Sequence, residues 1–161
     1  FEEEFDLLLI GSGPLENEIR KWGTGLPAGQ RVHLHKSVPH SQIAAMMNVM
    51  DVFVLPSLTT KFWKEQFGHV LIEAMASEVP VVGSSSGEIP NVIGDAGCVI
   101  PEDDPRMLRE ILQRLGVDPA LRSDLAVRGR ARVLSKYTHR QISREMLSFC
   151  HSITSGSSNG H

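Results

Sequence analysis

Cysteine is scarce in this sequence of 161 residues, which contains only Cys98 and Cys150. The two stand far apart, neither belongs to a Cys-x-x-Cys pair, and no group of Cys and His residues has the spacing of a metal site. A disulfide framework is therefore excluded. We expect two idle thiols in a protein of the reducing cytoplasm, without a bound metal.

Long apolar runs and an excess of charge of one sign are also lacking. Runs such as 7–10 and 52–55 are about four residues long, whereas a membrane-spanning helix needs about 20. The formal charge is −3 and the isoelectric point is about 6.2, so bulk electrostatics gives no reason to expect a nucleic-acid partner. With 41% hydrophobic and 22% charged residues, the composition is that of an ordinary globular domain.

What the sequence does contain is a regular alternation of strand-like and helix-like segments. Short apolar or alternating runs predict strands at 7–10, 31–35, 51–55, 79–82 and 97–100. Helical spacing and capping residues predict helices at about 16–22, 39–50, 70–75, 88–93, 105–115, 119–136 and 138–153. This order predicts an α/β fold, a Rossmann-like open and mostly parallel sheet with helices on both faces. The domain should span residues 1–154, and the Ser/Gly-rich segment 155–161 should be a disordered tail.

The loops that follow the strands are the places to look for function, because open α/β sheets bind ligands beyond the carboxyl ends of their strands. One of them, Gly11-Ser12-Gly13-Pro14, begins like a dinucleotide-binding fingerprint. The position of the third glycine, however, holds Glu16, whose carboxylate would face a pyrophosphate. We interpret this segment as a tight strand-to-helix turn that could still line a ligand pocket.

The most informative stretch runs from Glu65 to Ala76 and holds two glutamates eight residues apart. In one continuous helix, eight steps of about 100° would leave them roughly 80° apart rather than on one face. Gly68 favours another arrangement, with Glu65 in a loop and Glu73 inside a helix that begins near 67–69. The unpaired N–H groups of that first turn would suit phosphate or sugar hydroxyls. The alternative is a solvated loop charge at Glu65 and an exposed helix charge at Glu73.

Several motifs around this stretch resemble one family, the retaining glycosyltransferases of family 4, which have the two-domain GT-B fold. The motifs are Gly11-Ser12-Gly13-Pro14, Leu55-Pro56-Ser57, Glu65-Gln66-Phe67-Gly68, Glu73-Ala74-Met75-Ala76, Val79-Pro80-Val81-Val82-Gly83, Ser86-Gly87-Glu88-Ile89-Pro90 and Asp95-Ala96-Gly97. The resemblance covers residues 5–150 and places the chain in the C-terminal, donor-binding half of such an enzyme. It implies a hexosyltransferase that takes the sugar of a UDP-, GDP- or ADP-sugar to a glycan, lipid or small-molecule hydroxyl.

The resemblance also assigns roles to individual residues. Glu73 would bind the nucleotide ribose, and Glu65, in the catalytic position, would hold the donor sugar near its 3- and 4-hydroxyls. Backbone N–H groups of Phe67, Gly68, His69 and Val70 would meet sugar and diphosphate oxygens. Gly11 and Gly13 would let the chain approach the donor, and the segment 35–38, which includes Lys36, would border the base. The family needs no metal or other cofactor, because a helix dipole and basic side chains take up the pyrophosphate charge.

Two departures from the family pattern matter. Glu78 stands where the family usually has a glycine at a helix end, so we expect either a strained residue or a different turn there. The family also has a preceding strand with an Arg and a Lys that hold the diphosphate, and an acceptor-binding N-terminal domain. Neither is found before Phe1, so we expect the domain to lack its first strand and the chain alone to transfer little sugar.

Alternatives remain open at this point. The chain could be a nucleotide-sugar sensing module without turnover, or half of a sugar-nucleotide epimerase of the same fold. The C-terminal helices are rich in arginine, which predicts a solvated basic face or, as a second reading, contact with an anionic membrane surface.

Overall fold

The structure is a computed structural model that describes residues 4–156, with the side chains of 155 and 156 left undescribed. The chain divides into two compact units, residues 1–46 and 47–161. The segment 155–161, predicted as a disordered tail, is helical at its first two residues, and 157–161 lie outside the described residues.

The first unit is a parallel strand pair with one covering helix. Its elements are β1 (Phe5–Ile10), α1 (Glu16–Gly23), β2 (Gln30–His35) and the start of α2 (His40–Met47). Leu7 pairs with Val32 and Leu9 with Leu34. Because a Cβ at Gly23 would lie 3.3 Å from the Cβ of Val32, the end of α1 packs directly on β2. The helix predicted to reach residue 50 ends at Met47.

The opposite side of this strand pair carries an ion-paired cluster. Asp6 accepts hydrogen bonds from Arg31 Nε at 2.8 Å and lies 2.7 Å from His33 Nε2. The hydrogen bond from Arg31, with a smaller contribution from His33, lowers the pKa of Asp6 to about 2. The cluster is exposed to solvent, so it contributes little to stability.

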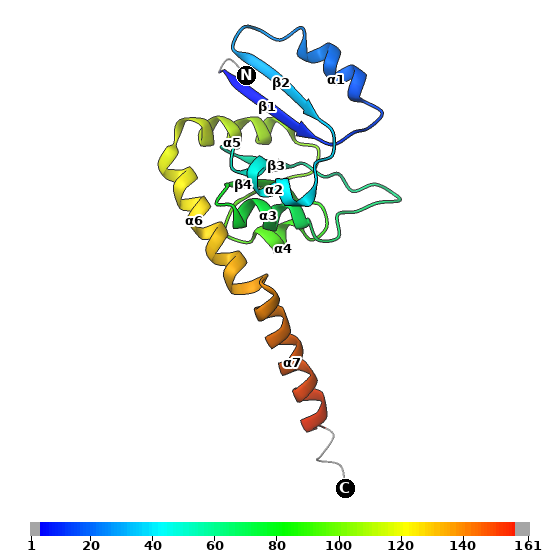
Figure 1. The fold of residues 1–161 in the computed structure, drawn as a ribbon, viewed down its shortest axis with the longest axis vertical. Helices are drawn as coiled ribbons and strands as arrows, with labels where there is room; N and C mark the ends of the chain where they lie inside the picture. The colour runs from blue at the N-terminus through cyan, green and yellow to red at the C-terminus, as the bar shows by residue number, and fades with distance from the viewer. Residues whose placement is uncertain (1–3, 157–161) are drawn as a thin grey trace. The chain divides into compact units, whose positions relative to one another are not determined.

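The second unit is a three-stranded parallel sheet with helices on both faces (Figure 1). Its sheet has the order β3-β4-β5, with β3 at Phe53–Leu55, β4 at Val81–Ser84 and β5 at Cys98–Ile100. The helices are α3 (His69–Ala76), α4 (Ile89–Ile93), α5 (Pro105–Val117), α6 (Pro119–Lys136) and α7 (His139–Gly156). Together with the first unit, this confirms the predicted α/β fold class.

The core of the second unit lies on both sides of β4, whose residues are all buried. Successive side chains of a strand point to opposite faces. On one face Val82 packs with Ile100, Leu115 and Leu125 of β5, α5 and α6. On the other face a Cβ at Gly83 would lie 2.5 Å from Ile89 and 2.7 Å from Ile93 of α4. Glycine at 83 thus lets α4 approach the sheet backbone.

The strand pairing differs from the single sheet that the sequence suggested. Within residues 4–156, β1 pairs with β2, and β3, β4 and β5 form a sheet of their own. Each of the two sheets is parallel throughout.

The arginines of the C-terminal helices are not simply a solvated face. Several donate to backbone carbonyls within the second unit: Arg122 to Leu115 and Gly116, Arg128 to Asp95, Arg130 to Ala76, and Arg132 to Asn91 and Val92. Cations near the last carbonyls of a helix satisfy acceptors that have no intrahelical partner. These arginines therefore bind α6 to the C-terminal ends of α3, α4 and α5.

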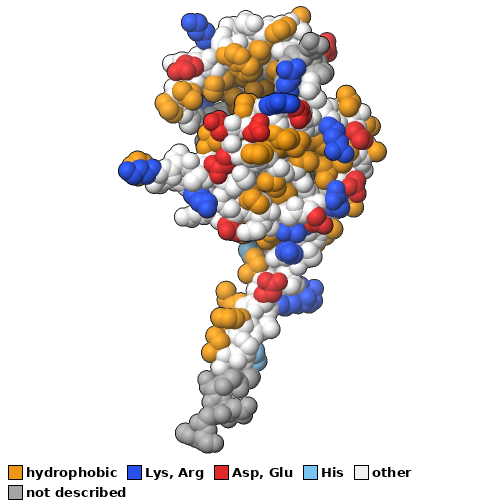
Figure 2. All heavy atoms as spheres, turned by 180° about the vertical axis from the view of Figure 1, so that it is seen from behind, with side chains coloured by type: hydrophobic (Ala, Val, Ile, Leu, Met, Phe, Trp, Pro, Cys, Tyr) orange, Lys and Arg blue, Asp and Glu red, His pale blue; other side chains and the backbone are white. Residues whose placement is uncertain are grey.

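Helix α7 is amphipathic. Hydrophobic side chains run along one side of it (Figure 2), and Ile142, Met146, Phe149 and Ile153 are 45–66% exposed. Their spacing of four, three and four residues is that of one helical face.

Glu78 adopts the strained conformation that the sequence suggested. Its φ is 59°, in the left-handed region, immediately after α3. The neighbouring Val79 N–H donates to the Ala74 carbonyl at 3.0 Å, which closes the C-terminal turn of the helix. A residue with a Cβ pays about 1–2 kcal/mol for this conformation.

We expect Glu78→Gly to raise the free energy of unfolding by about 0.5 kcal/mol. The strain energy that glycine relieves in the folded state exceeds the entropic cost of ordering a more flexible residue. Chemical denaturation measures this. Glu78→Ala separates the strain from the exposed ion pair with Arg130 at 3.3 Å, since it loses the pair and keeps the strain. Ser77→Gly, at a position with φ of −86°, should destabilise; a gain there as well would argue against strain at 78.

Candidate functional site

The candidate site lies where three neighbouring strands end. The loop 56–68 follows β3, residues 85–88 follow β4 and residues 101–104 follow β5. Since these strands are parallel neighbours, their carboxyl ends meet at one edge of the sheet. Ligands of open α/β sheets bind at this edge.

The first turn of α3 forms the centre of the site. The helix begins at His69, and Gly68 before it has a φ of 75° and is buried. A Cβ at Gly68 would lie 3.0 Å from Leu71 Cδ1, so a side chain there would be both strained and crowded. The predicted helix start near 67–69 is thus confirmed, and glycine makes the sharp entry into the helix possible.

Glu65 reaches back to this helix start. Its Oε1 accepts hydrogen bonds from the Gly68 N–H at 3.0 Å and from the Phe67 N–H at 3.4 Å. A carboxylate is favourable at this place, because N–H groups without intrahelical acceptors and the positive end of the helix dipole both face it. Glu65 is therefore neither a solvated loop charge nor part of the helix, and it holds the two residues that lead into α3.

The backbone of Glu65 is fixed as well. Its carbonyl accepts a hydrogen bond from the Glu88 N–H at 3.3 Å, beside Gly87 with a φ of 57°. A Cβ at Gly87 would lie only 1.7 Å from the Glu65 carbonyl oxygen. The loop after β3 and the turn after β4 can touch in this way only because residue 87 is glycine.

The remaining predicted residues of the second unit surround the same helix start. His69 and Val70 occupy the first two helical positions, where N–H groups have no intrahelical acceptor. The His69 side chain is exposed and stacks edge-on against the Phe67 ring, at 4.8 Å between centroids. Glu73 lies in the second turn of α3, partly exposed and off the buried face that Leu71 and Ala74 form.

The predicted residues of the first unit gather at the carboxyl ends of β1 and β2. Gly11 has a φ of 142° and donates its N–H to the His35 carbonyl at 2.8 Å. A Cβ at Gly11 or at Gly13 would meet no atom within 4 Å, so both leave open space around the backbone. Lys36 is exposed, one residue after β2.

A polar network that the sequence reasoning missed lies beside Glu65. Ser84 Oγ donates to the Ser57 carbonyl at 2.5 Å, and Thr59 Oγ1 lies 2.9 Å from Ser86 Oγ. Thr59 also donates to Glu102. Hydrogen bonds from Thr59 hold the pKa of the Glu102 carboxyl below its usual value, so Glu102 is ionised at neutral pH. The available signal was position alone, because Glu102 lies two residues after a predicted strand.

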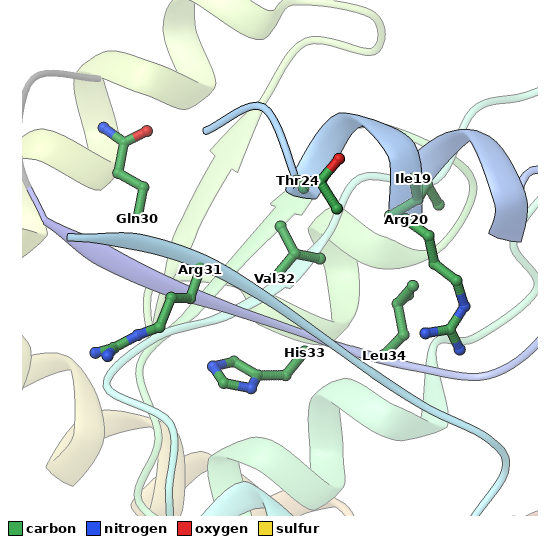
Figure 3. A pocket seen from close by; sticks show the side chains of 9 residues that line it. Ile19, Arg20, Thr24, Gln30, Arg31, Val32, His33 and Leu34 are labelled. Atoms are coloured by element: carbon green, nitrogen blue, oxygen red, sulfur yellow. The ribbon is translucent and has the colours of Figure 1, made fainter. Parts of the chain in front are cut away.

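One cavity lies away from the candidate site. It lies in the first unit, has a volume of about 520 Å³, and is lined by residues of α1 and β2 (Figure 3). Val32 and Leu34 point to the α1 side of β2, and Arg31 and His33 to the other side. None of the residues predicted to bind a donor lines this cavity.

Among the described residues, no three His, Cys, Asp or Glu side chains come together as a metal-binding group. Within the same part of the chain, no helix has the length and apolar character needed to cross a bilayer.

The family follows from a comparison with known proteins. The family model for glycosyl transferases group 1 matches residues 2–132, which include most of each unit and the whole candidate site. The chain belongs to this family. Glu65, Gly68 and Glu73 all lie inside the matched segment.

Curated relatives agree with this membership. The capsular polysaccharide biosynthesis glycosyltransferase CapM of Staphylococcus aureus is 35% identical over 143 residues, which are 87% of this chain and 36% of that protein. A GDP-mannose-dependent mannosyltransferase of Corynebacterium glutamicum, which acts on monoacylated phosphatidylinositol monomannoside, is 30% identical over 82% of this chain and 35% of its own length. The chain thus spans about a third of the length of the relatives it matches.

Solved structures place the fold among GT-B glycosyltransferases. Sucrose-phosphate synthase from Thermosynechococcus elongatus has a TM-score of 0.74 and 28% identity, over 93% of this chain and 39% of that chain. The C-terminal domain of the group 1 glycosyl transferase LpcC from Francisella tularensis has a TM-score of 0.62 and 26% identity, over 78% of this chain and 61% of that chain. Both are mixed α/β structures like the one described here.

Proposed function

We propose that this chain is the donor-binding half of a retaining glycosyltransferase that moves a hexose from a nucleotide-diphospho-sugar to a hydroxyl of a glycan, lipid or small molecule. The observation that carries the proposal is the start of α3. There the Glu65 carboxylate binds the amides that lead into α3, at the carboxyl edge of a parallel sheet, with Glu73 in the second turn of the same helix, in a chain whose family transfers sugars.

Each part of this arrangement suits a part of the donor. The N–H groups of His69 and Val70 and the dipole of α3 favour the diphosphate, whose charge grows as it leaves. The Glu73 carboxylate can accept hydrogen bonds from two ribose hydroxyls, and Glu65 can accept them from the sugar. Gly11, Gly13 and Lys36 stay predictions as donor contacts. In this proposal no metal or cofactor takes part.

Relatives and neighbours suggest the class of donor. The mannosyltransferase of Corynebacterium glutamicum is GDP-mannose-dependent by name, and the Anabaena protein HepE, which has this fold at a TM-score of 0.68 and 19% identity, was solved with UDP-glucose. We propose a UDP-, GDP- or ADP-sugar donor. The two free cysteines accord with the cytoplasmic location that we propose for the reaction.

We further propose that turnover needs residues beyond those described. The chain spans about a third of the length of the relatives it matches. This supports an acceptor-binding half outside this chain that supplies the other side of the reaction.

Calorimetry with UDP, GDP and ADP tests the proposal. We expect one of the three to bind the chain, and Glu73→Ala to cost about 1–3 kcal/mol of that affinity through lost charge-assisted hydrogen bonds. Glu18→Ala removes an exposed glutamate from α1 and serves as the matched control. No binding of any of the three nucleotides, or equal affinity of the Glu73→Ala variant and the wild type, would overturn the proposal.

A further inference from the structure

Glu102 is hydrogen-bonded to the loops that form the candidate site, although it is not among the residues predicted to bind a donor. Glu102, two residues after β5, accepts two hydrogen bonds from Thr59 in the loop after β3. The Thr59 N–H donates to Oε2 at 2.5 Å and the Thr59 hydroxyl donates to Oε1 at 2.7 Å. Both carboxylate oxygens thus bind Thr59. This fixes the orientation of Thr59 as well as its distance from Glu102.

The turn after β4 joins this contact. The Thr59 and Ser86 hydroxyls are 2.9 Å apart, and either of them could be the donor. Ser86 is completely buried, and its side chain also interacts with the Glu102 carboxylate. The Glu102 N–H in turn donates to Ser85 Oγ at 3.2 Å. The segments after β3, β4 and β5 are therefore linked by a chain of hydrogen bonds that ends at Glu102.

The linked loop is the one that carries Glu65. Its first residues are held by the bond from Ser84 to the Ser57 carbonyl, and its last by the bond from Glu88 to the Glu65 carbonyl. Thr59 lies between these two points, in a segment that is otherwise exposed. Without the contact to Glu102, the loop from 58 to 64 would span the gap between its two ends with no further anchor to β5.

We propose that Glu102 is a positioning residue of the donor site: by binding Thr59 through both carboxylate oxygens, it holds the loop 57–68 so that the Glu65 carboxylate faces the sugar of a nucleotide-sugar. This rests on the proposed function, because it assigns the sugar to Glu65. Glu102 does not touch the donor and takes no part in the chemistry. It acts through the loop, so its removal should weaken the hold on the sugar and leave the nucleotide contacts of Glu73 intact.

The test compares variants of the whole chain in two measurements. Glu102→Gln keeps the shape but has one carbonyl oxygen for two donors, so one of the two Thr59 hydrogen bonds is lost. Thr59→Val loses the hydroxyl, whereas Thr59→Ser keeps both donors and should restore wild-type behaviour. Glu110→Gln, on α5 with a local contact to Arg106, is the matched control.

The first measurement is hydrogen–deuterium exchange. We expect Glu102→Gln and Thr59→Val to speed exchange in peptides covering 57–68 by about tenfold. One hydrogen bond to a charged group changes the equilibrium between the closed and the open loop by about that factor or more. Peptides from α6 should be unaffected, as should all peptides of Thr59→Ser and Glu110→Gln. Unchanged exchange in the loop would show that Glu102 does not hold it.

The second measurement is the ratio of affinities for a nucleotide-sugar and its nucleotide, with the pairs UDP-glucose and UDP, GDP-mannose and GDP, and ADP-glucose and ADP. We expect Glu102→Gln to lower this ratio about tenfold, with the affinity for the nucleotide changed less than about twofold. Faster exchange with an unchanged ratio would overturn the positioning role and leave only a structural contact. If the wild-type chain binds none of the six compounds, the proposed function fails and the positioning role fails with it.

Discussion

Gly87→Ala should lower the free energy of unfolding by about 3 kcal/mol or more. Two costs add up. Alanine at a φ of 57° is strained by about 1–2 kcal/mol, and its Cβ would lie 1.7 Å from the Glu65 carbonyl oxygen. The atom that the Cβ would meet is a backbone oxygen, which cannot rotate out of the way as a flexible side chain could. The loop carrying Glu65 must therefore move away from the turn after β4, at a cost comparable to overpacking a core, about 1–3 kcal/mol.

Urea denaturation of Gly87→Ala beside Gly116→Ala checks this expectation. Gly116 lies inside α5 with open space where a Cβ would go, so alanine there should leave stability unchanged or raise it by up to about 1 kcal/mol. A Gly87→Ala variant as stable as Gly116→Ala would show that the turn after β4 does not approach Glu65 as closely as described. Because the displaced loop carries Glu65, the variant should also lose affinity for a nucleotide-sugar.

Elements with strong local signals were predictable from the sequence. Helix α6 runs over Pro119–Lys136 as predicted, because Asp118 caps its N-terminus by accepting from the Leu121 N–H at 2.8 Å and Pro119 suits the first helical position. The entry into α3 at Gly68 was predictable for the same reason, since glycine at a helix boundary marks a backbone that other residues avoid.

The ends of elements that depend on a neighbouring helix or strand were harder to predict. The strand predicted at 79–82 lies at Val81–Ser84 instead. The Val79 N–H is used in closing the end of α3, and Pro80 has no N–H to give to a sheet. The strand begins at residue 81, although the Pro80 carbonyl accepts from the Phe53 N–H of β3 and Val79 has the side chain of a strand residue.

Contacts between distant residues could not be predicted at all. Thr59 and Glu102 are 43 positions apart, and no pattern of residue types indicates that a loop threonine will meet a carboxylate after a later strand. The bonds from Glu65 to the entry of α3 were missed for a different reason. The sequence analysis left the Phe67 and Gly68 amides open for a donor, whereas in the structure both amides donate to the Glu65 carboxylate.

Glu65→Ala should have two effects of different origin. Loss of the carboxylate from the Phe67 and Gly68 amides should lower the free energy of unfolding by about 1 kcal/mol, as loss of a helix cap does. Glu65→Gln keeps an acceptor oxygen and should lose only the part due to charge at the helix start, about 0.3–1 kcal/mol. Chemical denaturation should therefore rank the proteins in the order wild type, Glu65→Gln, Glu65→Ala.

The same variants should change donor binding in a way that the loss of these two hydrogen bonds alone cannot explain. A carboxylate can accept about four hydrogen bonds. Oε1 faces the two amides, and Oε2 is 3.5 Å from Ser57 Oγ, at the limit of a hydrogen bond, so Oε2 retains capacity for sugar hydroxyls. We expect Glu65→Ala to weaken nucleotide-sugar binding about 10- to 100-fold by calorimetry. Affinity for the bare nucleotide should stay constant or rise, because a negative charge no longer competes with the diphosphate for the start of α3. An equal loss of both affinities would mean that Glu65 merely holds the helix and that some other group grips the sugar.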